Sequence, residues 1–323
     1  MTVTFQTRRP NGVVIPTTYD QMFFPAGEAH VKVVENADAG PDVVEIARVY
    51  GMGHSDLFLL GMWADACRRR GSRMILLMPY LPGARADHAD FVPLGAEVYS
   101  RFIAMLDVDE LVTLDPHSPV MPSILTQLMK REPHVIDSTQ LVAKHVVPKG
   151  GYTGIIAPDK GAVARASAVA DAAGLPLYKA EKKRDPDTGK LSGFTCEPLP
   201  ADGRFLVVDD ICDGGGTFMG LAAAIADADG TEGSYPGERT RRWKDRLGLY
   251  VSHGVFSGNA SALSDYFGEV WTTDSMQTAE WHRNLADMFE EGSDYGDILI
   301  PEVIMLEDAF EDSIEQILTA VPA

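Results

Sequence analysis

Two adjacent carboxylates stand immediately before a glycine-rich loop in this chain. Asp209 and Asp210 follow residues 205–208, an apolar run that predicts a buried parallel strand. Residues 213–217 are expected to form a tight loop, and residues 219–225 a helix. Backbone N–H groups at a helix N-terminus can hold a phosphate, while carboxylates accept hydrogen bonds from sugar hydroxyls. The ordered combination predicts a phosphosugar-binding site rather than an ordinary acidic turn.

This stretch resembles the phosphoribosyl-pyrophosphate signature of type I phosphoribosyltransferases and of ribose-phosphate pyrophosphokinases. Other segments resemble motifs of the pyrophosphokinases alone and follow that family's order: residues 24–28, 79–87, 114–118, 157–161, 182–184 and 253–258. Simple phosphoribosyltransferases are shorter and lack a counterpart of the first half. The chain therefore resembles the ribose-phosphate pyrophosphokinase family over about residues 20–270.

Apolar runs alternate with helical patterns along the chain, which predicts an α/β fold. Repeated strand–helix–strand units imply parallel sheets with helices on both faces. Strands are expected at 74–78, 110–114, 154–157, 176–178, 205–208 and 247–251, and helices at 56–67 and 161–173. Proline and paired glycines interrupt the pattern near 146–151, so we expect two domains, 1–147 and 148–323. The resemblance implies two tandem type I phosphoribosyltransferase-like domains, each a mainly parallel sheet flanked by helices.

Composition narrows the class of protein. The chain has 323 residues, 45% of them hydrophobic and 23% charged, as in soluble globular enzymes. A net charge of −19 argues against nucleic-acid binding, because a phosphate backbone would be repelled. No apolar run approaches the length of a membrane span, and no signal peptide is recognisable. Three widely spaced cysteines suggest neither a disulfide framework nor a zinc site, which favours a cytoplasmic location.

The resemblance implies Mg²⁺-dependent transfer of the β,γ-pyrophosphoryl group of ATP to the anomeric hydroxyl of ribose 5-phosphate. Lys182 and Arg184 match the family's catalytic basic residues, and residues 185–193 beyond them are expected to form a mobile loop. The predicted ribose-phosphate site comprises Asp209, Asp210, Asp213, Gly214, Gly215, Gly216 and Thr217.

On the ATP side, the resemblance assigns binding residues to the first half of the chain: Phe24, Glu28, Arg85, Asp87 and His117. In the family, Phe24 and Glu28 reach adenine from a neighbouring subunit, which implies a homo-oligomer with shared active sites. His117 and Asp159 are the candidate metal-site residues, although Asp159 could instead cap the next helix. Residues 227–243, rich in glycine and charge, look like a surface insertion.

Departures from the family pattern leave the acceptor open. Ala26 replaces an aspartate, and Gly214 replaces the threonine that usually helps to hold the ribose 5′-phosphate. A glycine there leaves space for a larger substituent on that phosphate. ADP-ribose, used by some phage-type relatives, is therefore an alternative acceptor, and its product would be ADP-ribose pyrophosphate for NAD synthesis. Alternatives of another class are a phosphoribosyltransferase and a non-catalytic regulatory subunit.

Overall fold

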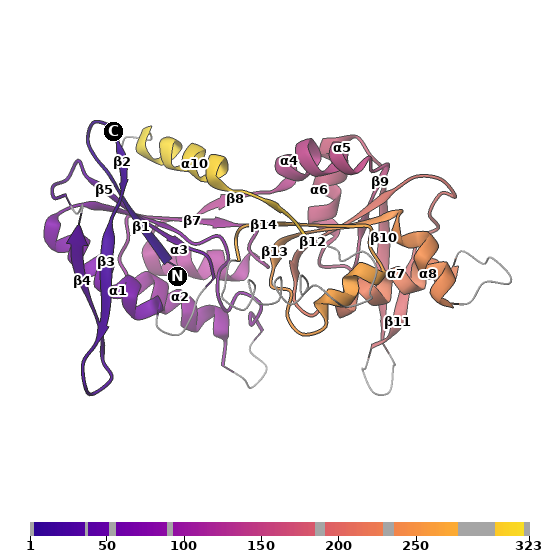
Figure 1. The fold of residues 1–323 in the computed structure, drawn as a ribbon, viewed down its shortest axis with the longest axis horizontal. Helices are drawn as coiled ribbons and strands as arrows, with labels where there is room; N and C mark the ends of the chain where they lie inside the picture. Colours follow the sequence, from indigo (N-terminus) through magenta and orange to yellow (C-terminus); the bar gives the residue numbers. More distant parts are fainter. Residues whose placement is uncertain are drawn as a thin grey trace, which may run out of the picture. The chain divides into compact units, whose positions relative to one another are not determined.

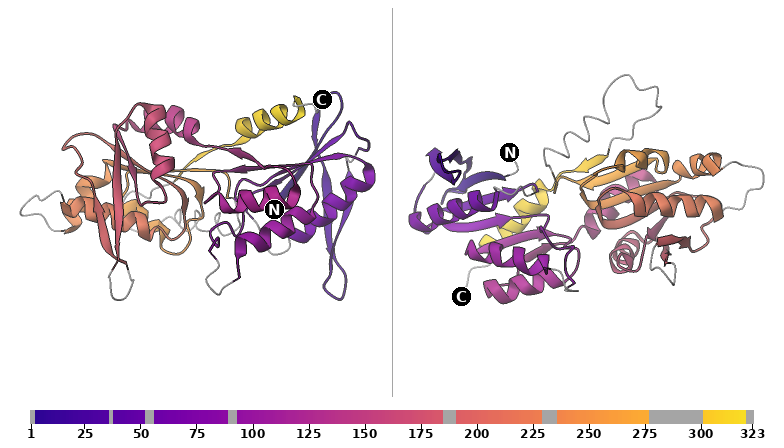
Figure 2. Two further views of the ribbon diagram at one scale, coloured as in Figure 1. Left: turned by 180° about the vertical axis from the view of Figure 1, so that it is seen from behind. Right: turned by 90° about the horizontal axis from the view of Figure 1, so that it is seen from below.

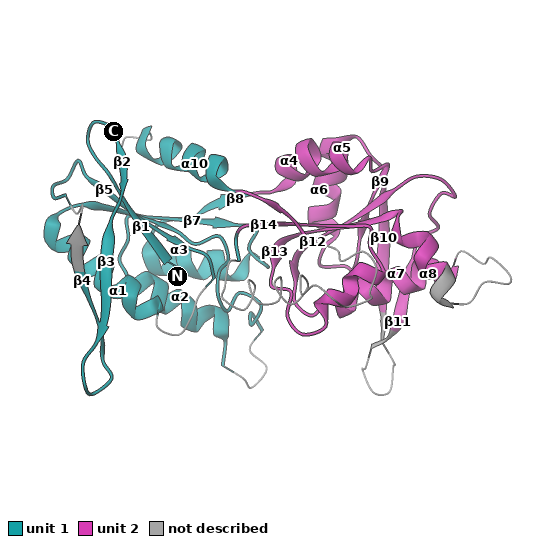
Figure 3. Cartoon of the chain, in the orientation of Figure 1, with its two compact units in different colours: residues 1–136, 275–279, 306–323 teal, residues 137–274, 280–305 magenta. Residues whose placement is uncertain are grey.

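The chain folds into two compact units. The computed structural model describes residues 3–35, 38–51, 56–88, 93–184, 191–228, 236–276 and 301–319 (Figure 1). Unit 1 comprises residues 1–136, 275–279 and 306–323, and unit 2 comprises residues 137–274 and 280–305 (Figure 3). The predicted division at 147/148 differs from this one, because residues 139–150 are helical and belong to unit 2, while the C-terminal segment returns to unit 1.

Unit 1 is built on a six-stranded sheet in the order β2-β1-β5-β6-β7-β8. Strands β5 to β8 are parallel, whereas β1 pairs antiparallel with both β2 and β5. The strands are β1 Val3–Arg8, β2 Val14–Pro16, β5 Val44–Val49, β6 Arg73–Leu77, β7 Glu110–Leu114 and β8 His134–Ile136. The helices are α1 Asp56–Arg70, α2 Gly95–Met105, α3 Val120–Met129 and α10 Glu307–Thr319. The antiparallel strands at the start of the chain were not foreseen.

A separate hairpin in unit 1 is formed by β3 (Thr18–Phe23) and β4 (Ala29–Glu35). Its first strand is tied to the sheet by buried polar groups. Arg70 donates to the hydroxyl of Tyr19 at 3.0 Å and to Glu45 Oε1 at 2.9 Å. The Glu45 carboxylate is fully buried, so removing this arginine would leave an uncompensated charge inside the unit.

Unit 2 is built on a seven-stranded sheet in the order β11-β10-β9-β12-β13-β14-β15, parallel except for β11. The strands are β9 Gly154–Ala157, β10 Leu177–Arg184, β11 Leu191–Cys196, β12 Phe205–Cys212, β13 Leu247–Gly254, β14 Glu269–Thr273 and β15 Glu302–Ile304. The helices are α4 Thr139–Leu141, the π-helix η1 Val142–Val146, α5 Val147–Gly150, α6 Val163–Ala173, α7 Gly216–Ala228, α8 Pro236–Lys244 and the 3-10 helix η2 Ala260–Asp265. These sheets confirm the predicted α/β class with mainly parallel strands.

The central strand β12 is buried on both faces. Leu206 and Val208 share one core cluster with Ala166 and Val169 of α6. Phe205 and Val207 belong to a second cluster, which includes the buried residues of α7. Helices α6 and α7 therefore lie on opposite faces of the sheet (Figure 1 and Figure 2). Burial on both faces explains why the strand reads as a continuous apolar run.

Three predicted elements differ from the observed ones. Strand β12 continues to Cys212, because its pairing with β13 extends to that residue, so the two acids lie within the strand and not after it. Lys182 lies on β10, paired with β11, and β11 begins at Leu191 inside the predicted loop. The end of the predicted insertion forms α8, whose Trp243 is buried in the core.

No helix in the described ranges is long and apolar enough to cross a membrane.

Candidate active site

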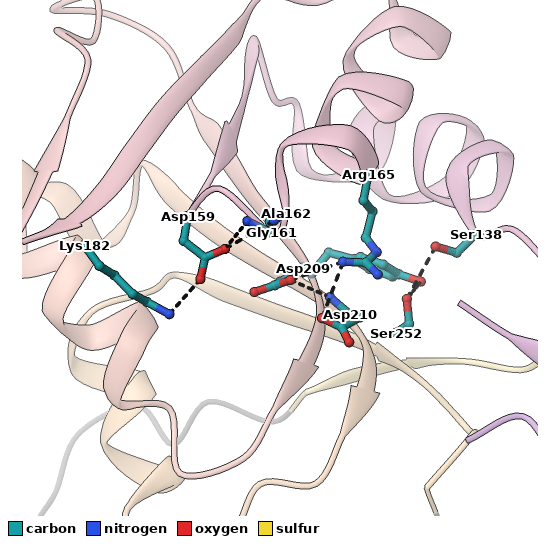
Figure 4. Close-up of polar contacts among 10 residues, drawn as sticks. Ser138, Asp159, Gly161, Ala162, Arg165, Lys182, Asp209, Asp210 and Ser252 are labelled. Carbon is teal, nitrogen blue, oxygen red and sulfur yellow. Dashed lines mark hydrogen bonds and ion pairs between the residues drawn. The ribbon is translucent and has the colours of Figure 1, made fainter. Parts of the chain in front are cut away.

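The adjacent carboxylates of β12 share one cation, Arg165 of α6 (Figure 4). Arg165 Nη1 lies 3.3 Å from Asp209 Oδ1 and 3.4 Å from Asp210 Oδ1. Asp209 Oδ1 also accepts the backbone N–H of Asp210 at 2.9 Å. The side chains are mostly buried, with Asp210 only 5% exposed. Groups of unit 2 thus help to fix the pair in position.

The proximity of the two acids alters their ionisation. Burial, and then the neighbouring charge of Asp210, raises the pKa of Asp209 to about 8, against the lowering effect of Arg165. Two carboxylates this close resist carrying two charges at once. Hydrogen-bond donors, such as the hydroxyls of a sugar, would stabilise the ionised carboxylates. The ionised pair would therefore bind these donors tightly.

The glycine loop leads directly into α7. The chain turns at Gly215, whose φ of +74° favours glycine, and the N–H groups of Phe218 and Met219 donate to its carbonyl oxygen. Space beside the loop is uneven. A Cβ at Gly215 would press against Leu263 at 3.1 Å, whereas one at Gly216 would meet nothing within 4 Å. The helix therefore begins at an open position, with its first N–H groups and dipole available to an anion.

Asp213 is held at the start of the same loop. Its carboxylate accepts a hydrogen bond from the hydroxyl of Ser257, in the segment after β13. The N–H of Ser257 in turn donates to the Asp213 carbonyl oxygen at 3.2 Å. The loop is thus fastened from both sides, and the predicted ribose-phosphate residues from Asp209 to Thr217 occupy one continuous stretch of unit 2.

Lys182 and Asp159 form an ion pair on the same sheet. Lys182 Nζ of β10 lies 2.6 Å from Asp159 Oδ2, in the turn after β9. Asp159 Oδ1 accepts the N–H groups of Gly161 and Ala162 at 2.9 and 3.2 Å. Burial alone would raise the pKa of Asp159, but Lys182 and these two N–H groups outweigh it and lower the pKa. Asp159 fastens the turn before α6 rather than capping the helix itself, whose first residue is Val163.

The second predicted catalytic residue, Arg184, ends β10, but its side chain lies outside the described residues. Residues 185–190 of the predicted loop also lie outside them.

In unit 1, three of the predicted ATP-binding residues follow the neighbouring parallel strands β6 and β7: Arg85, Asp87 and His117. The hydroxyl of Ser118 donates to Asp87 Oδ2 at 2.7 Å and thereby joins the two segments. Arg85 and His117 are exposed, whereas the Asp87 side chain is only 7% exposed. The structure thus brings the segment of Asp87 together with that of His117.

Phe24 and Glu28 occupy the turn of the β3–β4 hairpin. The Phe24 N–H donates to the Glu28 carbonyl oxygen at 2.9 Å, and the Phe24 ring lies 5.5 Å from that of His30. Both predicted adenine contacts are exposed, with Phe24 47% accessible. An exposed phenylalanine at a hairpin tip is suited to stacking on a planar group.

The two candidate metal-site residues belong to different units, His117 to unit 1 and Asp159 to unit 2. Within the described ranges, no three His, Cys, Asp or Glu side chains are grouped as a ready-made metal site. Both oxygens of Asp159 are already hydrogen-bonded, so this carboxylate is suited to contacting a cation through water. Mg²⁺ commonly keeps several water ligands and is compatible with that role.

Arg165 is the site residue that the sequence analysis missed. It lies among alanines in a segment that was expected only to form a helical crossover. The available signal was a single basic residue near the start of a helix whose other residues are mostly small and apolar. Its partners on β12 became visible only in the structure.

Comparison with known proteins finds a family that matches the segment of the chain containing this site. The phosphoribosyl transferase domain family matches residues 127–232. A ribose-phosphate pyrophosphokinase from Bradyrhizobium diazoefficiens is 29% identical over 265 residues, which cover 77% of this chain and 74% of the relative. One from Pyrococcus furiosus is 29% identical over 260 residues, covering 79% and 85%.

The fold extends the likeness beyond that domain. The crystal structure of phosphoribosylpyrophosphate synthetase from Mycobacterium smegmatis matches with a TM-score of 0.67 and 18% identity, covering 94% of this chain and 91% of that one. Most of the segment that matches the phosphoribosyl transferase domain family lies in unit 2. The chain is thus similar to ribose-phosphate pyrophosphokinases over about three quarters of its length, and it is an enzyme.

Proposed function

We propose that this enzyme transfers the β,γ-pyrophosphoryl group of ATP to the anomeric hydroxyl of ribose 5-phosphate, giving phosphoribosyl pyrophosphate and AMP. The observation that carries this proposal is the assembly of Asp209 and Asp210, the 213–217 loop and the Lys182–Asp159 pair within unit 2. Carboxylates suit the ribose hydroxyls, a helix N-terminus suits the 5′-phosphate, and a cation suits the transferred group.

The reaction requires positioning and charge neutralisation rather than a covalent enzyme intermediate. The anomeric oxygen attacks the β-phosphorus, the bond from that phosphorus to the α–β bridging oxygen breaks, and AMP leaves with the bond electrons. Asp209 and Asp210 orient the sugar, and the open start of α7 binds its 5′-phosphate. Lys182 neutralises charge that builds on the transferred group, with Arg184 as its proposed partner.

Mg²⁺, when bound, would neutralise the phosphates of ATP; His117 of unit 1 and, through water, Asp159 of unit 2 are each proposed as a metal-site residue. Arg85 and Asp87 are proposed to bind ATP, Arg85 by pairing with phosphate. We further propose that Phe24 and Glu28 serve the adenine site of a second copy, so that the working enzyme is a homo-oligomer. Cytoplasmic location is proposed because all three cysteines are free thiols.

ADP-ribose is the second candidate acceptor, and Gly214 favours it. A Cβ at Gly214 would meet only the carbonyl oxygen of Ser257, at 3.7 Å, so the position is spacious. This space could admit the AMP moiety attached to the phosphate of ADP-ribose. Its free ribose offers the same anomeric hydroxyl, and the product would be ADP-ribose pyrophosphate, a precursor for NAD synthesis.

The deciding experiment is to incubate the enzyme with Mg–ATP and each acceptor separately, and to measure AMP release and the mass of the product. We expect AMP in a one-to-one ratio with a pyrophosphorylated sugar. Lys182→Ala serves as the catalytic blank, and Lys179→Ala, an exposed lysine of the same strand, as its matched control. Folded enzyme that releases no AMP with either acceptor would contradict the proposal and favour a regulatory subunit.

Gly214→Thr tests the choice of acceptor. The added side chain should exclude a substituent on the 5′-phosphate, so turnover of ADP-ribose should fall by about tenfold or more, while ribose 5-phosphate is spared. An unmodified enzyme that ignores ADP-ribose at millimolar concentration would eliminate this second acceptor.

A further inference from the structure

Arg165 contacts both carboxylates of the β12 pair. Neighbouring side chains on a strand point to opposite faces of the sheet. Leu206 and Val208 face α6, so alternation places Asp210 on that face and directs Asp209 to the other. Asp209 Oδ1 nevertheless bonds the Asp210 N–H and also lies 3.3 Å from Arg165 Nη1. One guanidinium nitrogen therefore contacts two side chains that the strand geometry would separate.

The arginine itself is held in a restricted environment. Its side chain is 18% exposed, and it arises from the first turn of α6, whose Ala166 and Val169 pack into the core beneath it. Asp210 is 5% exposed, so a charge there needs a partner inside the protein. These features distinguish Arg165 from a surface ion pair, which would contribute little.

We infer that Arg165 is a positioning residue, which fixes Asp209 and Asp210 in one orientation as acceptors for the hydroxyls of the ribose substrate. This inference rests on the proposed function, because it assigns the carboxylates to a sugar. Arg165 acts through the two acids and is not assigned a contact with the reacting atoms. The inference predicts that acceptor binding, and not ATP binding, depends on this residue.

The test measures binding directly, by calorimetry with ribose 5-phosphate and with ADP-ribose, and separately with ATP. Arg165→Met keeps the length of the stem and removes the charge. We expect the acceptor Kd to rise by about 10- to 100-fold and the ATP Kd to change by less than about twofold. Arg165→Lys retains a charge but not the guanidinium, and should recover part of the affinity. Arg241→Met, an exposed arginine of α8, is the matched control.

A pH series separates positioning from a merely structural role. Other charged or titratable groups in this part of unit 2 include Asp159 (Figure 4), Asp213 close along the chain, and His253, which pairs with Ile211 of β12; all are the same in every variant. Arg165 lowers the pKa of Asp209, so losing its charge makes this acid harder to ionise, and acceptor affinity in Arg165→Met should recover as the pH rises from 7 to 9.5. A structural defect would weaken binding by the same factor at every pH.

The outcomes distinguish this inference from the proposed function. Acceptor binding that depends on Arg165, with no AMP release from the parent enzyme, would support positioning and reject the pyrophosphokinase reaction. AMP release with an acceptor Kd unchanged in folded Arg165→Met would overturn the positioning role alone. Equal weakening of ATP and acceptor in both Arg165 variants would also overturn it. If the methionine variant does not fold, Arg165→Lys and Arg165→Gln decide the question. Acceptor affinity and its pH dependence that are unchanged in both of these variants would reject the positioning role.

Discussion

The two units differ in how far their candidate site residues are exposed to solvent. In unit 2, ion pairs already hold the site residues without a ligand. Arg165 pairs with Asp209 and Asp210, and Lys182 pairs with Asp159. In unit 1, Arg85 and His117 are exposed, as are Phe24 and Glu28 on the hairpin. The proposed acceptor site is therefore preorganised, whereas four of the five proposed nucleotide-binding residues are exposed to solvent.

This difference has an energetic consequence. A preorganised site has already met the cost of burying and orienting its charges during folding, so less is lost when the ligand binds. Exposed side chains must be ordered at the moment of binding, which costs about 0.5–1.5 kcal/mol for each rotamer-rich side chain. Substitutions in unit 2 should consequently have larger effects on the reaction than substitutions in unit 1.

Lys182→Ala should give the largest effect. Loss of a cation at the transferred group should lower kcat by about 100- to 1000-fold, with smaller changes in both KM values. Steady-state kinetics with Mg–ATP and the active acceptor measures this, with circular dichroism to confirm folding. Near-normal turnover in the folded variant would remove Lys182 from the catalytic residues.

Asp210→Asn should come next. An amide offers one acceptor oxygen where the carboxylate offers two and carries no charge to pair with Arg165, so the acceptor Kd should rise by about 10- to 100-fold. Calorimetry with the acceptor and with ATP measures the contrast. If both ligands weaken equally, the pair does not recognise the sugar specifically, and the comparison between the units fails.

Ser118→Ala tests unit 1 and should have a smaller effect. It removes the 2.7 Å hydrogen bond that joins the segments of Asp87 and His117. The KM for ATP should rise by about 3- to 10-fold, with that of the acceptor unchanged. Ser123→Ala, an exposed serine of α3, is the matched control. A rise in the acceptor KM instead would show that the two substrates are assigned to the wrong units.

Asp209→Asn should change stability, and in a pH-dependent way. The pKa of this acid is raised to about 8 in the fold, against about 4 in the unfolded chain. Its contribution to stability is therefore full below about pH 4 and is lost as the pH rises through about 8. Asparagine stays neutral, so the ligand-free variant should gain at least about 2 °C in Tm over the parent between pH 5 and 9.

Calorimetric scans at pH 5, 7 and 9 measure this difference, with the exposed Asp171→Asn of α6 as control. A difference in Tm that does not vary with pH would show that the raised pKa of Asp209 does not govern stability. A variant that is more stable but binds the acceptor more weakly would show that the native carboxylate improves binding at a cost in stability.

Sequence patterns predicted the elements that are buried on both faces. The runs at 110–114 and 154–157 became β7 and β9 with the expected bounds, because parallel buried strands read as continuous apolar segments. The antiparallel strands β1 to β4 were missed, since alternating and exposed positions give a weaker signal. A loop was predicted at 185–193 from polar residues with proline and glycine, yet β11 begins at Leu191 within it and pairs antiparallel with β10.

The candidate site shows a similar division. The proposed ribose-phosphate residues could be named from the motif around Asp209, because all of them lie in one short stretch of the chain. Arg165 lies more than one element away, and only the packing of α6 against β12 brings it to the acids. The Lys182–Asp159 contact likewise depends on the pairing of β10 with β9. Pairing between separate elements is what the sequence alone did not reveal.

Helix α10 gives unit 1 a particular history during synthesis. Phe310 is 1% exposed, the guanidinium of Arg48 lies 4.8 Å from its ring, and Glu315 pairs with Arg8 at 2.8 Å. All of unit 2 is translated between residue 136 and this helix. At ordinary elongation rates, the early strands wait about 10–30 s for the residues that cover them. A chain whose synthesis stops before residue 306 would leave unit 1 with an apolar face uncovered. Chaperones and proteases recognise such surfaces.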